Sequence, residues 1–281
     1  MISAKRQLLA SLAILGIIAS VFEGKIFFLQ LLFSMLVACL VDGLWTRYDT
    51  TQWTVPKSAA ISGLLVGGIL LQGTSSWIVA LVATIAVASK HIFRYNGRHI
   101  FNPANFGLVV AGFLQMSADA GLLQLDLAQT WWIESAPSGL FALEFLPVPA
   151  LIVALALVWR MKRWDLFLTY IVANTLFVGI SFWMAQGLAL SSAFWTAFTF
   201  SNLTFAGVML IEPMTTPWTT RGRMLFGGLV AFFTAILATQ PLIPHMTVVA
   251  LALGNLFVPW IKAREMQWGK SINTSMTPKA A

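Results

Sequence analysis

Long apolar runs separated by short polar loops make up nearly the whole chain. The runs occupy residues 8–22, 26–45, 58–72, 75–90, 103–117, 142–159, 165–184, 189–211, 224–239 and 243–261. Most of them reach or approach the roughly 17–25 residues that an α-helix needs to cross a bilayer. The pattern predicts an all-α polytopic membrane protein with about ten transmembrane helices. The third and fourth runs are short, so two tilted spans or one re-entrant pair would both fit them.

The charges of the loops predict how these spans are oriented. With a cytoplasmic N-terminus, ten spans place every one of the 17 Lys and Arg residues except Lys25 on the cytoplasmic side. The predicted outer loop over 118–141 contains Asp119, Asp126 and Glu134 but no basic residue. Because Lys and Arg accumulate in cytoplasmic loops, this asymmetry predicts that both termini are cytoplasmic. The alternative is a cleaved signal peptide over residues 1–22, which would leave nine spans.

Ten spans divide into two sets of five, and an odd number per set gives the sets opposite orientations. This is the arrangement of inverted-repeat membrane folds. We therefore expect a single transmembrane domain over residues 1–262, with inverted halves at 1–117 and 142–262. Residues 263–281 are polar and basic, and they are expected to form a cytoplasmic tail.

Composition supports the membrane interpretation and excludes several functions. The chain is 58% hydrophobic and 10% charged, with a net charge of +7 and one cysteine, whereas soluble domains carry about 25% charged residues. The bilayer explains the basic residues, so no nucleic-acid partner is predicted. There is no Lys-containing phosphate loop, no HExxH and no CxxCH, and none of the three histidines sits mid-span with a spaced partner. We predict no metal site and no catalytic residue.

The segment HIFNPANFG, residues 99–107, places two amides and a proline at the start of an apolar run. Asn102 suits an N-cap and Pro103 suits the first helical position. A capped helix does not explain Asn105, whose amide enters the helix. A helix N-terminus also offers free N–H groups to a ligand. The basic residues Lys90 and Arg98 come just before it, either as cytoplasmic anchors or as contacts to an anionic ring or phosphate.

A second polar segment, MLIEPMTTPWTTRGR, covers residues 209–223. Glu212 ends the eighth predicted span, Pro213 breaks the helix, and Thr215 and Thr216 follow. A carboxylate at the membrane edge is costly without a partner, which Arg98 or Arg221 would supply. The segment is either a polar cytoplasmic turn or part of a binding site.

Together, SKHIFRYNGRHIFNPANFG and MLIEPMTTPWTTRGR resemble segments of a known family, the NqrB/RnfD-like proteins. NqrB belongs to the sodium-pumping NADH:quinone oxidoreductase and RnfD to the Rnf electron transport complex. The chain looks most like the family's compact stand-alone branch. The resemblance implies ten spans in the bacterial inner membrane and bound flavin. By position it assigns Lys90, Asn102, Pro103 and Asn105 to the family's first motif, and Glu212, Pro213, Thr215 and Thr216 to its second. Together with Arg98, whose charge like that of Lys90 would favour reduced anionic flavin, these residues make up the expected cofactor site.

Family members attach FMN to a threonine on the outer side of the membrane. In this chain the outer loop offers Thr130 within AQTWW, which does not match that context. The flavin, FMN or riboflavin, is therefore expected to be bound non-covalently.

The resulting hypothesis is a flavin-binding electron-transfer subunit. Its partners would be the bilayer, other redox subunits, or a flavoprotein or ferredoxin-like electron donor. A transporter or channel for a small solute, flavin or ion is the alternative, because inverted halves with broken helices also suit transport. A scaffold subunit that has lost its cofactor is a third possibility.

Overall fold

The computed structural model describes residues 4–51, 56–70, 72–119, 121, 147–200, 203–239 and 246–275. Within these ranges the chain is almost entirely helical. The helices are α1 (Ala4–Glu23), α2 (Lys25–Thr50), α3 (Lys57–Ile69), α4 (Ser76–Ile92), α5 (Pro103–Asp119), α7 (Pro147–Met161), α8 (Trp164–Gln186), α9 (Leu190–Phe200), α10 (Leu203–Val208), α11 (Thr220–Ala238) and α12 (Met246–Ser275). Two short strands, β1 (Arg94–Tyr95) and β2 (Arg98–His99), join α4 to α5.

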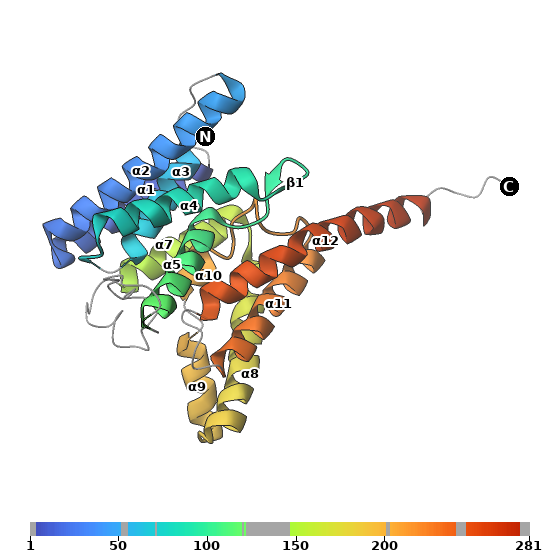
Figure 1. Cartoon of the computed structure of the whole chain (residues 1–281). Helices are drawn as coiled ribbons and strands as arrows, with labels where there is room; N and C mark the ends of the chain where they lie inside the picture. The colour runs from blue at the N-terminus through green and yellow to red at the C-terminus, as the bar shows by residue number, and fades with distance from the viewer. Residues whose placement is uncertain are drawn as a thin grey trace.

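The described part of each predicted apolar run is mainly helical, with two differences. The run over 189–211 is divided into two elements: α9 packs against α8, whereas α10 packs mainly against α7. The final helix does not end near residue 261 but continues to Ser275 despite Pro259 inside it, and in Figure 1 its end extends away from the other helices. Most of the predicted outer loop, including Thr130, and most of the TQPLIPHM loop at 239–246 lie outside the described residues.

Four of the described helices are long and apolar enough to cross a membrane: Lys25–Thr50, Trp164–Gln186, Thr220–Ala238 and the Met246–Gln267 part of α12. Shorter apolar helices accompany them, among them α3 and α4. Many large apolar side chains on these helices face outward, for example Leu36, Val172 and Phe232. This is the exterior of an all-α membrane protein, since lipid rather than water contacts such surfaces. The full count of ten spans stays a prediction.

The helices pack in two sets, and each packed pair in one set has a counterpart at the same place in the other. In the first set α2 packs against α3 and α4, and α4 against α5; in the second, α8 packs against α9 and α11, and α11 against α12. The sets meet where α5 contacts α12 and where α1 contacts α7. Figure 1 shows α1–α4 on one side and α8, α9 and α11 on the other, with α5, α7 and α10 between them.

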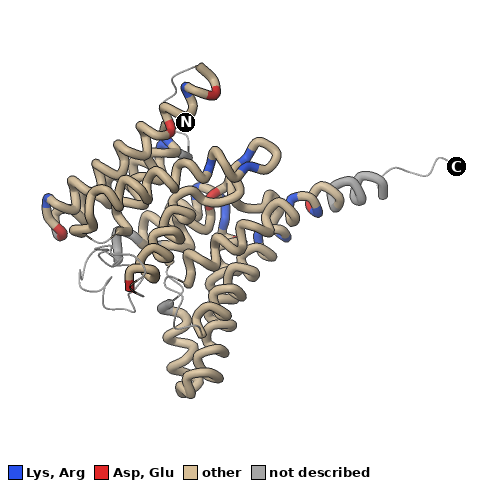
Figure 2. The backbone as a smooth tube through the Cα atoms, viewed as in Figure 1, with Lys and Arg blue, Asp and Glu red and all other residues tan. Residues whose placement is uncertain are grey.

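The β1–β2 hairpin positions the polar residues that precede α5. Its turn consists of Asn96 and Gly97, both with positive φ (49° and 74°), the conformation that a tight Asn-Gly hairpin turn requires. The strands pair antiparallel, with Arg94 opposite His99. Figure 2 shows Lys and Arg gathered around this hairpin, the end of α4 and the adjoining part of α12.

Candidate functional site

The start of α5 is capped as the sequence predicts. The Oδ1 atom of Asn102 accepts a hydrogen bond from the backbone N–H of Asn105 at 3.2 Å, and Pro103 is the first helical residue. The side chain of Asn102 also donates from Nδ2 to the carbonyl of Met209 at 3.3 Å. One buried amide therefore caps α5 and ties it to the chain that leaves α10.

Asn105 links the start of α5 to the start of α12. Its Nδ2 donates to the carbonyl of Val248 at 3.0 Å, and the residue is completely buried. Its Oδ1 has no hydrogen-bond partner in the described part of the protein. A buried acceptor without a partner costs about 1–3 kcal/mol, so this atom marks a place where a ligand or water would be stabilised.

Asn255 in α12 presents a second set of unpaired polar atoms. The residue is completely buried, and neither atom of its side-chain amide finds a partner among the described residues. Buried asparagines in membrane helices usually bond to a neighbouring helix, and within the described residues this one does not. Pro259, four residues later, has no N–H to donate to the Asn255 carbonyl. Asn255 lies seven residues after Val248, about two turns along the same helix face.

The acid-proline-threonine segment forms a compact turn beside Asn102. The Thr216 hydroxyl donates to the Glu212 carbonyl at 2.9 Å, and the Thr215 hydroxyl lies 3.3 Å from the Glu212 carboxylate. The side chain paired with this carboxylate is His99, with Nε2 3.6 Å from Oε1. The predicted partners Arg98 and Arg221 form no ion pair with Glu212 in the described structure, because the hairpin turns His99 toward it instead.

The same turn continues into a tightly held start of α11. Thr219 is the N-cap, and its hydroxyl accepts from the Gly222 N–H at 3.1 Å. The buried Glu265 carboxylate of α12 accepts from the Trp218 N–H at 3.0 Å and from the Thr219 N–H and hydroxyl at 2.8 and 2.6 Å.

Arg163, just before α8, holds the other side of this turn. Its guanidinium donates to the Pro217 carbonyl at 3.1 Å. Burial lowers the pKa of Arg163, and the like charge of Arg223 adds to this effect. Arg223 is itself paired with Asp165. The turn is therefore bound by Glu265 of α12 on one side and by Arg163, at the start of α8, on the other.

Lys90 belongs to a separate cluster. Its Nζ lies 2.6 Å from Oδ1 of Asp42 in α2, and Nε2 of His91 lies 2.7 Å from the same oxygen. The His91 ring stacks on Trp45 with centroids 4.9 Å apart. Asp42 is only 5% exposed, so the buried carboxylate is neutralised locally.

Comparison with known proteins supplies the family. The NQR2, RnfD, RnfE family matches residues 3–267. The chain belongs to this family. The sequence resemblance, which rested on the two polar segments, is thereby confirmed.

Two relatives illustrate the functions named for such proteins. The chain is 22% identical over 308 aligned residues to the D component of the ion-translocating oxidoreductase complex of Yersinia pestis, covering 88% of each protein. It is 23% identical over 271 residues to the B component of the Na(+)-translocating NADH-quinone reductase of Chromohalobacter salexigens, covering 85% of this chain and 65% of that one. At 22–23% identity, the overall architecture of these relatives is a safer guide to this chain than the role of any single residue in them.

The structure brings most of the predicted site residues into one region. Asn102, next to Pro103 at the start of α5, bonds to Met209, three residues before Glu212 in the segment that continues to Thr215 and Thr216. Asn105 bonds instead to Val248 of α12, and Lys90 pairs with Asp42. Arg98 lies at the edge of this region, with its guanidinium 5.6 Å from the centre of the Trp218 ring. Sequence reasoning missed Glu265, which it placed in a polar tail. It also did not identify Asp42 as the partner of Lys90.

Proposed function

We propose that the protein is a flavin-binding electron-transfer subunit of an ion-translocating oxidoreductase in the bacterial inner membrane. Both relatives named above belong to ion- or sodium-translocating oxidoreductases, and family membership extends over almost the whole chain. Other redox subunits of such a complex are the expected partners. The basic hairpin surface would suit an acidic soluble donor, such as a flavoprotein or ferredoxin-like protein.

The observation that carries the flavin proposal is the pair of buried asparagines with unpaired atoms. Asn105 Oδ1 and the Asn255 amide lie on α5 and α12, which are joined by the bond from Asn105 to Val248. The pyrimidine edge of a flavin carries both an N–H donor and carbonyl acceptors, which a carboxamide group can match. A bound flavin would supply one- and two-electron redox chemistry. The protein would orient the ring and exclude water from it.

The remaining predicted residues take supporting parts in this proposal. Asn102 and Pro103 fix the start of α5, and Thr215 and Thr216 shape the turn that follows Glu212. Glu212 and Arg98 border the region with opposite charges. Lys90 makes no direct contact in this proposal, because its ammonium group is held by Asp42. FMN or riboflavin, bound without a covalent link, remains the proposed cofactor.

Two corresponding sets of helix pairs also support the proposal of inverted halves. The pairs α2–α4, α4–α5 and α2–α3 correspond to α8–α11, α11–α12 and α8–α9. Two helix contacts between the sets, α5–α12 and α1–α7, join corresponding helices, which a pseudo-two-fold axis between the halves would produce. In such folds the ligand lies where the repeats meet. In this proposal the α5–α12 contact would be that place.

The test is the visible spectrum of the full chain purified in mild detergent. We expect a flavin spectrum, and we expect the flavin to separate from the protein on denaturation. Asn105→Leu and Asn255→Leu should lose the flavin while keeping the elution profile of the folded protein. Asn174→Leu, which alters a buried asparagine of α8, is the matched control and should retain it. Asn102→Ser keeps an oxygen that can cap α5, but it replaces the amide that donates to Met209 with a shorter side chain.

Other outcomes would redirect the proposal. Flavin that stays on the denatured chain would show covalent attachment. A well-folded preparation without flavin would contradict the electron-transfer proposal and favour transport, which the division of one apolar run into α9 and α10 also permits. Uptake of a small solute, free flavin or ion into liposomes would then be measured.

A further inference from the structure

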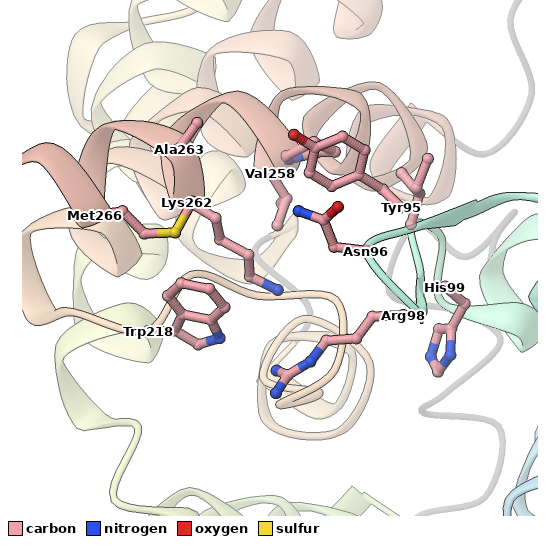
Figure 3. A pocket seen from close by; sticks show the side chains of 11 residues that line it. Tyr95, Asn96, Arg98, His99, Trp218, Val258, Lys262, Ala263 and Met266 are labelled. Carbon is pink, nitrogen blue, oxygen red and sulfur yellow. The ribbon is translucent and has the colours of Figure 1, made fainter.

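A half-open cavity of about 260 Å³ lies between the β1–β2 hairpin, the turn before α11, and α12 (Figure 3). Its volume is below the range of about 300–1,000 Å³ typical of sites for drug-sized molecules. The cavity is therefore suited to a small polar group rather than to a complete flavin. It is also separate from the buried atoms of Asn105 and Asn255, neither of which lines it.

Two cations face this cavity. Lys262 is 8% exposed, its Nζ donates to the Met214 carbonyl at 3.2 Å, and it lies 5.4 Å from the centre of the Trp218 ring. The Arg98 guanidinium lies 5.6 Å from the same ring. Figure 3 shows both side chains ending in one space beside Trp218. Among the described residues, neither cation forms an ion pair with a carboxylate.

The nearby carboxylates are engaged elsewhere. Glu265 accepts three hydrogen bonds from Trp218 and Thr219. Glu212 faces His99. Cation–π contact with an indole offsets part of the cost of a largely buried ammonium group, but buried charges are usually paired with an opposite charge. Within the described structure, the cavity thus presents two positive groups without a carboxylate bound to either.

We propose that this cavity binds the phosphate group of an anionic ligand, with Arg98 and Lys262 as its charged contacts. Guanidinium and ammonium groups both form strong hydrogen bonds to phosphate oxygens. Basic pockets between membrane helices on the cytoplasmic side accept anionic lipid headgroups. A phospholipid headgroup and a soluble phosphate share this chemistry. The proposal does not rest on flavin binding.

The first arm of the test uses phosphatidylglycerol and the full chain in detergent, with retained lipid measured by native mass spectrometry. Arg98→Gln and Lys262→Met should each weaken retention at least about tenfold, as expected for lost charge-assisted hydrogen bonds. Arg94→Gln in the same hairpin and Arg264→Gln on the same helix are matched controls. Neither lines the cavity, and each should change retention less than about twofold, because a contact outside the site adds little. Lys262→Arg should retain the lipid.

The second arm titrates inorganic phosphate and follows tryptophan fluorescence, with Trp218→Phe providing the difference signal. A lipid site predicts variant-sensitive retention of phosphatidylglycerol and little response to phosphate. A soluble-phosphate site predicts a Trp218 response that disappears in Arg98→Gln, with lipid retention unaffected. Equal behaviour of the cavity variants and the matched controls in both arms would overturn the proposal. Thermal unfolding of each variant identifies any that fail to fold.

Discussion

Two basic clusters of this protein differ in how their charge is balanced. In the paired cluster, Lys90 and His91 share the buried carboxylate of Asp42. In the open cluster, Arg98 and Lys262 lie on Trp218 with no carboxylate bound to either in the described structure. The rule that places Lys and Arg in cytoplasmic loops treats both clusters alike. Only the structure separates cations that are neutralised internally from those available to a ligand.

The difference arises from where the nearest carboxylate is held. Asp42 comes from α2, which packs along α4 and brings its carboxylate to the end of that helix. Glu265 sits three residues after Lys262 on α12, but the start of α11 uses its carboxylate as an acceptor. The lack of a side chain at Gly222 leaves room for the Glu265 carboxylate in that position. A Cβ atom on residue 222 would lie 2.0 Å from Oε1.

The largest expected effect comes from breaking the paired cluster. Asp42→Asn leaves the largely buried Lys90 and His91 without their counter-charge, and such a loss typically costs about 3–5 kcal/mol. The free energy of unfolding, measured by denaturation in mixed micelles, should fall by about that amount. Asp49→Asn changes an exposed carboxylate on the same helix and should have little effect.

A double variant sharpens this prediction. Asp42→Asn combined with Lys90→Met removes both charges and should recover much of the lost stability, because replacing both members of a buried pair is often nearly neutral. If the double variant were no more stable than Asp42→Asn alone, charge balance would not explain the paired cluster.

The second prediction concerns the carboxylate kept away from the open cluster. Gly222→Ala should displace Glu265 and cost about 1–3 kcal/mol, the usual range for overpacking. Gly228→Ala is the matched control in the same helix, since nothing lies within 4 Å of its added Cβ, and it should leave stability unchanged or improve it. We also expect the displaced Glu265 to reduce phosphatidylglycerol retention by neutralising Lys262. Equal melting temperatures for the two variants would contradict this view of Gly222.

The fold could be predicted far more completely than the site. Helices in lipid must satisfy their own backbone hydrogen bonds, so long apolar runs translate directly into helices. The division into α9 and α10 was not predicted, because 189–211 was read as one apolar run although the polar pair Ser201–Asn202 falls between the two elements. The extension of α12 was missed because the polar residues after 262 were taken to end the helix. They continue it, and Glu265 among them binds the start of α11.

At the site, local rules succeeded and long-range pairing did not. Asn102 was predicted as an N-cap because capping depends on neighbours within the same turn. The link from Asn105 to Val248 joins residues 143 positions apart, and no local signal indicates it. Arg98 and His99 were part of an overlooked hairpin, although the Asn-Gly pair at residues 96–97 is the usual signal for such a turn. That turn explains why His99, and not Arg98, faces Glu212.

The third prediction tests the start of α5, which follows Arg98 in the chain. Asn102→Ala removes the cap of α5 and its bond to Met209, and it should cost about 1–2 kcal/mol. Asn102→Ser keeps a capping oxygen and should lose less. Thermal unfolding of both variants ranks them. A serine variant as unstable as the alanine variant would show that the bond to Met209, rather than the cap, stabilises this start.

The smallest expected effect contrasts one lysine from each cluster. Lys262→Met removes a cation without a carboxylate partner and leaves its aliphatic packing largely intact, so its unfolding free energy in lipid-free detergent should change by less than about 1 kcal/mol. Lys90→Met removes a partner of Asp42 and should destabilise clearly more. Adding phosphatidylglycerol should then stabilise the unmodified protein but not Lys262→Met, because a ligand stabilises only the state that binds it. If Lys262→Met were as destabilising as Lys90→Met without lipid, the open cluster would be structural and the contrast between the clusters would disappear.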